Sequence, residues 1–458
     1  GEGAMSNSRT DRPDPPAARY PRPALAWYVC LILLLAYILS FLDRTIVSLL
    51  VIPIEHDLHI NDTEVSLLQG FSFAIFYALL GLPVARLVDA RSRRLVVAAG
   101  ILVWSLMTAG CGLTARFWQL FLVRVGVGAG EAALLPGANS LLADYFPPQR
   151  RGLALGVFAT GIFLGSGAAL IIGGLVIRAL GTAPVTLPLL GQFHPWQVVF
   201  LVVGLPGILV AALMLTIREP PRLGTLGRGA ATGRGLPLAE VAAYMGANRL
   251  TLCCHTFGFT FLAFTSYAAS AWIPTMFVRE YGWSAAEVGI RFGLVALVIG
   301  PVGSVAGGWL CDRLEGQGRR DGKLRVGLIA ALGTILPGVA FPLAGNAAAA
   351  LALVVPFFFF VSFVWGIAPA ALQELLPNQM RGLGTAIYTG VLNLVALGGG
   401  PTSVAVLADY GLGGPAKLNL AIAIVVPISA LLAVLLFRIG LAPYRATLAR
   451  LDALRAAA

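Results

Sequence analysis

Four charged residues interrupt apolar runs of the amino-acid sequence. Asp43 and Arg44 are neighbours in one run, and Arg124 and Glu131 lie seven residues apart in another. Seven residues are about two turns of an α-helix, so Arg124 and Glu131 share nearly one face. Two acids and two bases form an almost neutral cluster, which lowers the cost of burying charge in a membrane, and a desolvated carboxylate can bind a proton. The pattern favours a functional site over a purely structural charge cluster.

Other residues are candidates for a substrate cavity near this cluster. Arg291 lies early in a later apolar run as a third buried base, and it either meets an anionic substrate or extends outward to the membrane surface. Aromatic side chains can give such a cavity an apolar wall, and the candidates are Tyr37, Phe71, Tyr77, Phe259 and Tyr388. We interpret His255 as a buried polar packing residue rather than a proton carrier.

The composition excludes a soluble protein. Of the 458 residues, 58% are hydrophobic and 12% are charged, whereas soluble domains carry about 25% charged residues. The long apolar runs predict membrane-spanning helices, and their lack of alternation excludes a β-barrel. Basic loops account for the net charge of +11, so nucleic-acid binding is not expected. The five cysteines show no metal-ligand spacing, and we expect neither a metal nor a cofactor.

Twelve apolar runs predict twelve transmembrane helices in an all-α polytopic membrane protein. They fall near 25–53, 63–86, 95–114, 117–143, 152–180, 196–217, 248–279, 285–311, 325–345, 349–375, 382–408 and 417–440. A Gly-, Arg- and Pro-rich stretch divides the runs six and six. We therefore expect a disordered tail (1–24) that begins with an expression remnant before Met5, an N-terminal half (25–217), a cytoplasmic linker (218–247), a C-terminal half (248–440) and a C-terminal tail (441–458).

Arginine is distributed unevenly between the predicted loops. Most loop arginines, including those at 91–94 and in the linker, lie on one side of the membrane. The other side holds Arg116, Arg178, Arg279 and Lys417. Basic loops stay in the cytoplasm, so both termini are predicted to be cytoplasmic. We expect a multi-pass protein of a bacterial inner membrane.

Short motifs recur along the chain at a nearly constant offset. Glu64 recurs as Glu287 and Asp89 recurs as Asp312, each after 223 residues. A second group recurs after 230 residues, with Pro147, Gln149, Arg151 and Gly152 matched by Pro377, Gln379, Arg381 and Gly382. Offsets this similar, in matching loops, predict two homologous six-helix halves, which is the architecture of major facilitator transporters.

Two of these repeated loops carry a recognisable motif. The stretch 85–94 resembles the major facilitator signature G-x-L-x-D-R-x-G-R-R, and its second copy at 308–313 is closer to the pattern. Helix N-termini favour carboxylates, so Asp89 is expected to contact the start of the eleventh span and Asp312 the start of the fifth. Ordinary solvated loop charge is the alternative. We assign a conformational latch to Asp89, Arg93, Asp144, Asp312 and Glu374.

A narrower resemblance emerges from three further motifs. Phe-Leu-Asp-Arg at 41–44, the Gly-rich run that ends in Gly-Glu at 130–131, and Trp196 with the stretch 200–207 together resemble the Spinster branch of this superfamily. Spinster proteins export sphingosine-1-phosphate and lysophospholipids in animals, and proton coupling is proposed for bacterial relatives. The resemblance implies an amphipathic, lipid-like substrate, with Asp43 and Glu131 as protonation sites and Arg44 and Arg124 as their partners.

The sequence thus predicts a secondary active transporter that moves an amphipathic, lipid-like or organic-anion substrate by alternating access, coupled to protons and in contact with membrane lipids. An uncoupled organic-anion facilitator is the alternative, and a channel is a weaker one. The motifs of common hydrolases and of nucleotide-binding loops are missing from the sequence, so an enzyme is not expected. An intramembrane lipid hydrolase that uses Asp43 and Glu131 stays conceivable. A monomer is expected, whereas the substrate and the direction of coupling stay open.

Overall fold

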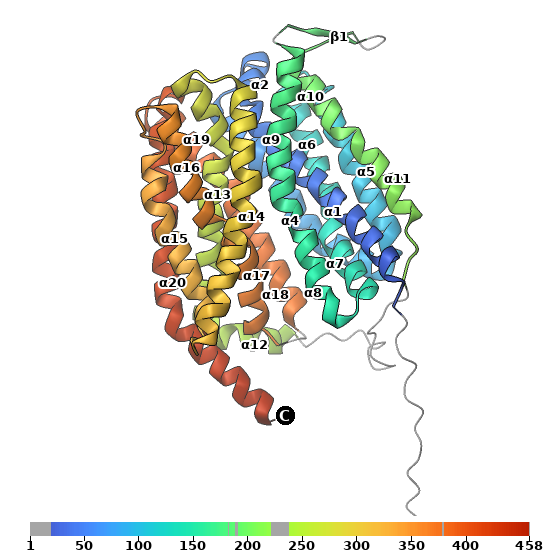
Figure 1. Ribbon diagram of the computed structural model, residues 1–458, viewed down its shortest axis with the longest axis vertical. Coiled ribbons are helices and arrows are strands. Elements are labelled where there is room, and N and C mark those ends of the chain that lie inside the picture. The colour runs from blue at the N-terminus through green and yellow to red at the C-terminus, as the bar shows by residue number, and fades with distance from the viewer. Residues whose placement is uncertain (1–19, 182, 188–190, 221–237, 378–379, 458) are drawn as a thin grey trace, which may run out of the picture.

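The fold is a bundle of long helices (Figure 1). A computed structural model describes residues 20–181, 183–187, 191–220, 238–377 and 380–457. In this described part of the chain, twelve helical segments are long and apolar enough to cross a membrane. They agree with the twelve predicted spans, and the prediction of a polytopic helical fold is confirmed.

The first half contains six spans, several of which are interrupted. Their elements are α1 (Pro23–Thr45), which continues through the 3₁₀ turn Ile46–Leu49 to α2 (Val51–Leu58); α3 (Asp62–Ser66), the π-helical turn Leu67–Phe71 and α4 (Ser72–Ala90); α5 (Arg93–Cys111); α6 (Phe117–Glu131) and α7 (Leu134–Tyr145); α8 (Pro148–Ala159) and α9 (Gly161–Leu180); and α10 (Pro195–Gly204) and α11 (Pro206–Thr216). Pro206 begins α11 because proline has no N–H to donate to the preceding turn.

The second half repeats this arrangement. Its elements are α12 (Leu238–Ala247), α13 (Arg249–Tyr281), α14 (Ala285–Gly316), α15 (Gly322–Ala340), α16 (Ala347–Val361), α17 (Val364–Leu375), α18 (Arg381–Val391), the π-helical turn Leu392–Gly398, α19 (Gly399–Val406), the π-helical turn Leu407–Gly411, the 3₁₀ turn Pro415–Lys417 and α20 (Leu418–Ala457). Buried apolar side chains form a large core mostly in this half, which Leu49, Val51, Val65 and Leu170 of the first half join. Two smaller cores lie mostly in the first half.

The two ends of the bundle are distinguished by their connections. At one end, β1 (Val185–Leu187) pairs antiparallel with β2 (Gly191–Phe193) between α9 and α10. We call this the hairpin end. The opposite end, which carries α12 and the last turns of α20, is called the linker end (Figure 1).

Helices α9 and α14 join the two halves through glycines. A Cβ atom on Gly167 would lie 2.9 Å from the carbonyl oxygen of Gly293, and one on Gly174 would lie 2.9 Å from that of Ala286. The missing side chains therefore allow the two backbones to approach closely. These contacts involve the part of α9 nearer the hairpin end, whereas α8 and α14 diverge toward the linker end (Figure 1).

Three segments contain structure that the sequence did not predict. The loop before α10 holds the short strands, and the predicted linker contains α12. The predicted tail 441–458 continues α20 as a helix through Ala457. Leu441, Tyr444, Thr447 and Leu451 are buried along it, at the spacing of one helix face, so this segment packs against the linker end. The expectations for residues 1–19 lie outside the described residues.

Candidate functional site

Glu131 ends α6 and is bound by side chains of α1. Arg44 donates hydrogen bonds to one Glu131 carboxylate oxygen from Nε at 2.7 Å and from Nη2 at 2.5 Å, and Ser40 donates to the same oxygen. Glu131 is buried, whereas 14% of the Arg44 side chain is exposed. The ion pair therefore lies at the border between the protein interior and an open space.

Asp43 occupies a different environment although it is the neighbour of Arg44. One of its carboxylate oxygens accepts a hydrogen bond from Thr108 of α5 at 3.0 Å, and the other has no partner in the described part of the chain. Arg124 donates to the backbone oxygen of Asp43 at 3.0 Å and to that of Leu68 at 3.1 Å. These carbonyls lie where α1 ends and where the second span turns π-helical. Arg124 thus stabilises irregular backbone rather than pairing directly with a carboxylate.

Aromatic rings surround the guanidinium of Arg44. Its Cζ lies 4.2 Å from the ring centroid of Phe73, 4.9 Å from that of Phe41 and 5.5 Å from that of Tyr77. Rings at these distances attract a cation electrostatically. Arg44 is therefore held by Glu131 and by three rings of its own half.

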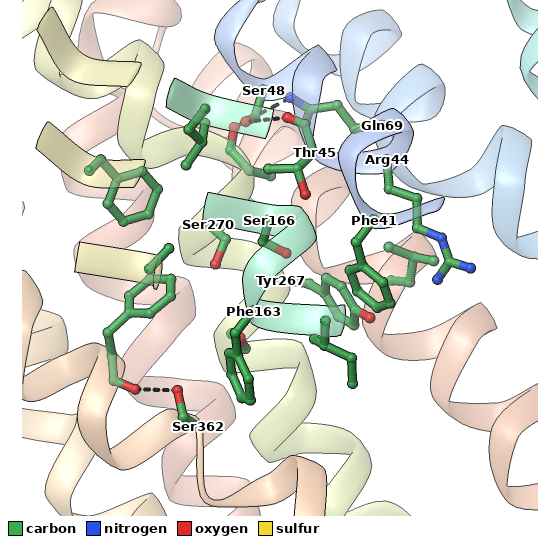
Figure 2. Close-up of a pocket in the computed structure, with 18 of the residues that line it drawn as sticks. Phe41, Arg44, Thr45, Ser48, Gln69, Phe163, Ser166, Tyr267, Ser270 and Ser362 are labelled. Atoms are coloured by element: carbon green, nitrogen blue, oxygen red, sulfur yellow. Dashed lines mark hydrogen bonds between the residues drawn. The ribbon is translucent and has the colours of Figure 1, made fainter. Parts of the chain in front are cut away.

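A cavity lies between the halves and is reached by Arg44. Aromatic side chains form much of its wall, with Phe41, Phe163, Tyr267, Phe292, Phe358 and Trp365 contributing. Figure 2 shows Gln69, Thr45 and Ser48 toward one end of it and Phe163 and Ser362 toward the other. Among the described residues that line it, Arg44 alone is charged.

The residues predicted to line the cavity lie elsewhere. Tyr37 contacts Phe41, and Tyr77 contacts Arg44, but neither tyrosine is among the residues that line the cavity. Phe71 packs against Gly398. Phe259 and Tyr388 instead pack around His255 in the second half.

The prediction that Arg291 is a buried base was wrong. About half of its side chain is exposed, and it pairs with Glu287 at 2.7 Å and lies 4.4 Å from the ring centroid of Trp283. The long side chain extends outward to partners on the surface instead of entering the cavity. His255 is buried with Nε2 2.9 Å from the Ala368 carbonyl oxygen, as expected for a packing residue.

The predicted latch residues form contacts within each half. Arg93 pairs with Asp144 and, at 2.8 Å, with Glu219. In the second half, Glu374 pairs with Lys323 at 2.5 Å. Asp312 is exposed at the linker end, and the side chain of Asp89 lies outside the described residues. The expected contacts of the two aspartates across the halves therefore stay a prediction.

Polar contacts at the hairpin end do join the two halves. Arg279 of α13 donates to both carboxylate oxygens of Asp62 at 2.7 Å and to Glu55 at 2.8 Å. The N–H and hydroxyl of Thr63 donate to Asp409 at 2.9 and 2.7 Å. We call these five residues the hairpin-end gate. Sequence reasoning missed it, although Arg279 was one of few arginines on its side of the membrane.

Glu55, outside the spanning segments, has an altered acidity. Burial, together with the hydrogen bond and charge of Asp62, raises the pKa of Glu55 to about 9 although Arg279 opposes this shift. A carboxylic acid at this position can donate to Asp62 while Arg279 neutralises Asp62. Around Arg279, the gate thus combines one proton, the two acids Glu55 and Asp62, and one base. No group of three metal-ligating side chains was found in the described part of the chain.

Comparisons with known proteins agree with this architecture. The family model of the Major Facilitator Superfamily matches residues 33–401. An MFS-type efflux pump of Mycolicibacterium smegmatis is 30% identical over 399 residues, which are 84% of this chain and 85% of the relative. A probable L-galactonate transporter of Escherichia coli is 27% identical over 70% of both chains. A crystal structure of a bacterial homologue of the human lysosomal transporter Spinster, inward-facing and unoccupied, superposes with a TM-score of 0.74 at 26% identity and covers 93% of this chain and 98% of that one.

Proposed function

Because this chain belongs to the Major Facilitator Superfamily and is similar to its Spinster members, we propose that it is a proton-coupled secondary transporter of an amphipathic or organic anion. The cavity between the halves binds the substrate, and the halves rock about it. The linker end faces the cytoplasm of a bacterial cell, in accordance with its arginines. The gate closes the hairpin end, which corresponds to an inward-facing state.

The position of Arg44 carries this proposal. Arg44 lines the cavity and is also the cation that neutralises buried Glu131. An anionic substrate that binds Arg44 competes with Glu131 for it. Glu131 would then be a buried carboxylate without a cation, which is costly unless it takes up a proton. Anion and proton therefore bind to the same state, and this favours symport.

The experiment measures substrate accumulation in proteoliposomes. A panel of lysolipids and organic anions is offered with an alkaline interior. For one proton per substrate, a gradient of one pH unit supports about tenfold accumulation, because one unit corresponds to about 1.4 kcal/mol. Glu131→Gln should abolish this accumulation, so that the substrate concentrations inside and outside become equal. Exchange of substrate without a pH gradient should partly persist. Glu287→Gln is the control. It alters an acid that pairs with Arg291 at the surface, and it should retain the tenfold accumulation.

An uncoupled facilitator of organic anions is the second candidate. The relative named as an L-galactonate transporter and the single cationic side chain among the described cavity residues favour an organic acid as substrate. A facilitator would equilibrate this acid without responding to a pH gradient, and Glu131→Gln would leave its flux unchanged. That result would exclude coupling through Glu131. Cleavage of an offered lysolipid would instead indicate a hydrolase.

A further inference from the structure

Besides the phenol of Tyr267, four aliphatic hydroxyl groups of the cavity have no hydrogen-bond partner among the described residues. They belong to Thr45, Ser166, Ser266 and Ser270, all of which line the cavity. None of the four is among the fully buried side-chain atoms that lack a partner, so each hydroxyl opens into the cavity space. Each of these groups therefore needs a partner from outside the chain, which is either water or the transported molecule.

Two other serines of the same cavity differ from these four. Ser48 donates to the carbonyl oxygen of Thr45 at 2.8 Å, and Ser362 donates to that of Phe358 at 2.6 Å. Their protons are already bound within their own helical segments, as is common for serine in membrane helices. The cavity thus contains both satisfied and free hydroxyls, and the free ones form a group.

The free hydroxyls come from both halves. Ser166 lies on α9 of the first half, and Ser266 and Ser270 lie one turn apart on one face of α13 in the second. Figure 2 shows Ser166 and Ser270 in the middle of the cavity, between Thr45 and Phe163. A ligand bound here would contact both halves at once.

The charge of Arg44 is directed away from this group. Its guanidinium is held by Glu131 and points past Phe41, away from Ser166 and Ser270 (Figure 2). A carboxylate or phosphate at the serines would lack a cation. A hydroxyl group needs none, and it both donates to and accepts from serine. The neighbouring aromatic rings complete an environment suited to an uncharged polar group.

We propose that Thr45, Ser166, Ser266 and Ser270 form a subsite that binds hydroxyl groups of the substrate, so that the transported molecule is a hydroxylated anion. This inference rests on the proposed function, which assigns the anionic group to Arg44. The serines then distinguish a hydroxylated acid from the same acid without hydroxyls. An acid without hydroxyl groups leaves these four side chains to water and gains no hydrogen bonds from them, so it binds more weakly.

The test compares two matched pairs of anions in binding experiments. The long-chain pair is 2,3-dihydroxydodecanoate and dodecanoate, and the small pair is gluconate and hexanoate. Binding to the full chain is followed by the fluorescence of Trp365, which lines the cavity, with Trp365→Phe identifying its signal. The hydroxylated member of at least one pair should bind about threefold to tenfold more tightly, as expected for one or two neutral hydrogen bonds.

Variants separate the subsite from the anion site. The double variant Ser166→Ala and Ser270→Ala should make the two members of the pair equal, whereas Ser362→Ala, the same change at a satisfied serine, should keep the preference. Equal affinities in the unmodified protein, or a preference that survives the double variant, would overturn the subsite. If the double variant weakens the binding of both members of the pair equally, the serines bind the anionic group of the ligand rather than its hydroxyl groups.

The proposed function fails in a different way. If none of the four anions binds, or if Arg44→Gln binds them as well as the unmodified protein, the anion site itself is wrong. Equal binding within both pairs, combined with loss of binding in Arg44→Gln, would retain the anion site and reject the hydroxyl subsite. The pair that shows the preference distinguishes a long-chain amphiphile from a small hydroxylated acid.

Discussion

Glu131 and Asp43 are both buried acids, but their surroundings give them different roles. One oxygen of Glu131 accepts hydrogen bonds from Arg44 and Ser40, and one oxygen of Asp43 accepts a hydrogen bond from Thr108 alone. The second oxygen of each acid has no partner among the described residues. A buried carboxylate with one neutral hydrogen bond is held in place at a cost, while a paired one is stabilised. Glu131 is therefore the better placed of the two to exchange a cation for a proton.

This difference predicts opposite effects on stability. Asp43→Asn removes a poorly satisfied charge and keeps the shape, so thermal unfolding in detergent should occur at an unchanged or higher temperature. Glu131→Ala leaves Arg44 without its carboxylate and should lower the free energy of unfolding by about 2 kcal/mol, typical of a hydrogen bond to a charged group. Tryptophan fluorescence during heating measures both. Equal destabilisation by the two changes would contradict the assignment.

The four buried charges were found from the sequence because charge is conspicuous in an apolar run. The pairing of these charges could not be predicted, because it depends on how the helices pack. Arg44 contacts Glu131 of another helix, and Arg124 donates to backbone carbonyl oxygens instead of a carboxylate. The cavity serines were also missed. A serine in an apolar helix carries no distinguishing pattern, and its role depends on whether its own helix satisfies it. Similarly, the sequence around Phe259 and Tyr388 does not distinguish them from the aromatic residues that line the cavity. Only their neighbours in the folded protein do.

At the scale of elements, the start of α5 is held by a carboxylate from the end of the sixth span. Glu219 accepts hydrogen bonds from the N–H of Arg94 at 3.0 Å, from Ser92 at 2.8 Å and from the side chain of Arg93 at 2.8 Å. Burial disfavours the charged form of Glu219, but these hydrogen bonds outweigh it and hold the pKa of Glu219 below its usual range. The carboxylate thus satisfies the positive end of α5.

Glu219→Gln should therefore destabilise the protein by about 1 kcal/mol near pH 7, the usual value of a helix cap. Because the pKa is lowered by folding, this stabilisation is present above about pH 4.3, the ordinary glutamate value, and is lost as the pH falls further. The variant and the unmodified protein should converge only below pH 4. Glu287→Gln serves as control, since its exposed ion pair contributes little. A constant difference down to pH 3 would contradict the role of the charge.

The spans themselves were predictable because each is long, apolar and bounded by polar loops. Their interruptions were not. The π-helical turns Leu67–Phe71 and Leu392–Gly398 meet where Gly70 approaches the backbone of Leu397 and Gly398, and such irregular turns depend on packing between helices. Helix α12 and the end of α20 were missed because short amphipathic segments in polar surroundings resemble loops until they have a surface to cover.

At the scale of the whole molecule, the internal repeat is visible in the charges of the linker end. Arg93 with Asp144 in the first half corresponds to Lys323 with Glu374 in the second, and both offsets are 230 residues. Each pair joins the start of the third span of its half to the end of the fourth. These pairs tie helices together within each half, whereas the hairpin-end gate has polar contacts between the halves.

The final prediction concerns the pH dependence of this gate. The closed gate raises the pKa of Glu55 to about 9, so the protonated form of Glu55 favours closure. This contribution is complete below the ordinary glutamate value of about 4.3 and is lost as the pH rises through 9. The ordinary value lies below pH 7 and the raised value two units above it, so the closed state should be about a hundredfold less favoured at pH 10 than at pH 7. The reason is that ionised Glu55 faces Asp62 across a single arginine.

Spin labels report this opening when they are attached to the variants His56→Cys and Ala416→Cys, which are exposed positions in the two halves. Cys253 is replaced by Ser because it is the exposed native cysteine. Their distance should increase between pH 7 and pH 10 in the unmodified protein. Glu55→Gln keeps the neutral form and should stay closed over this range, whereas Arg279→Gln removes the shared cation and should open the gate already at pH 7. An identical distance shift in Glu55→Gln would show that another group titrates, and a closed Arg279→Gln would mean that the glycine crossing of α9 and α14, rather than the gate, holds the halves together.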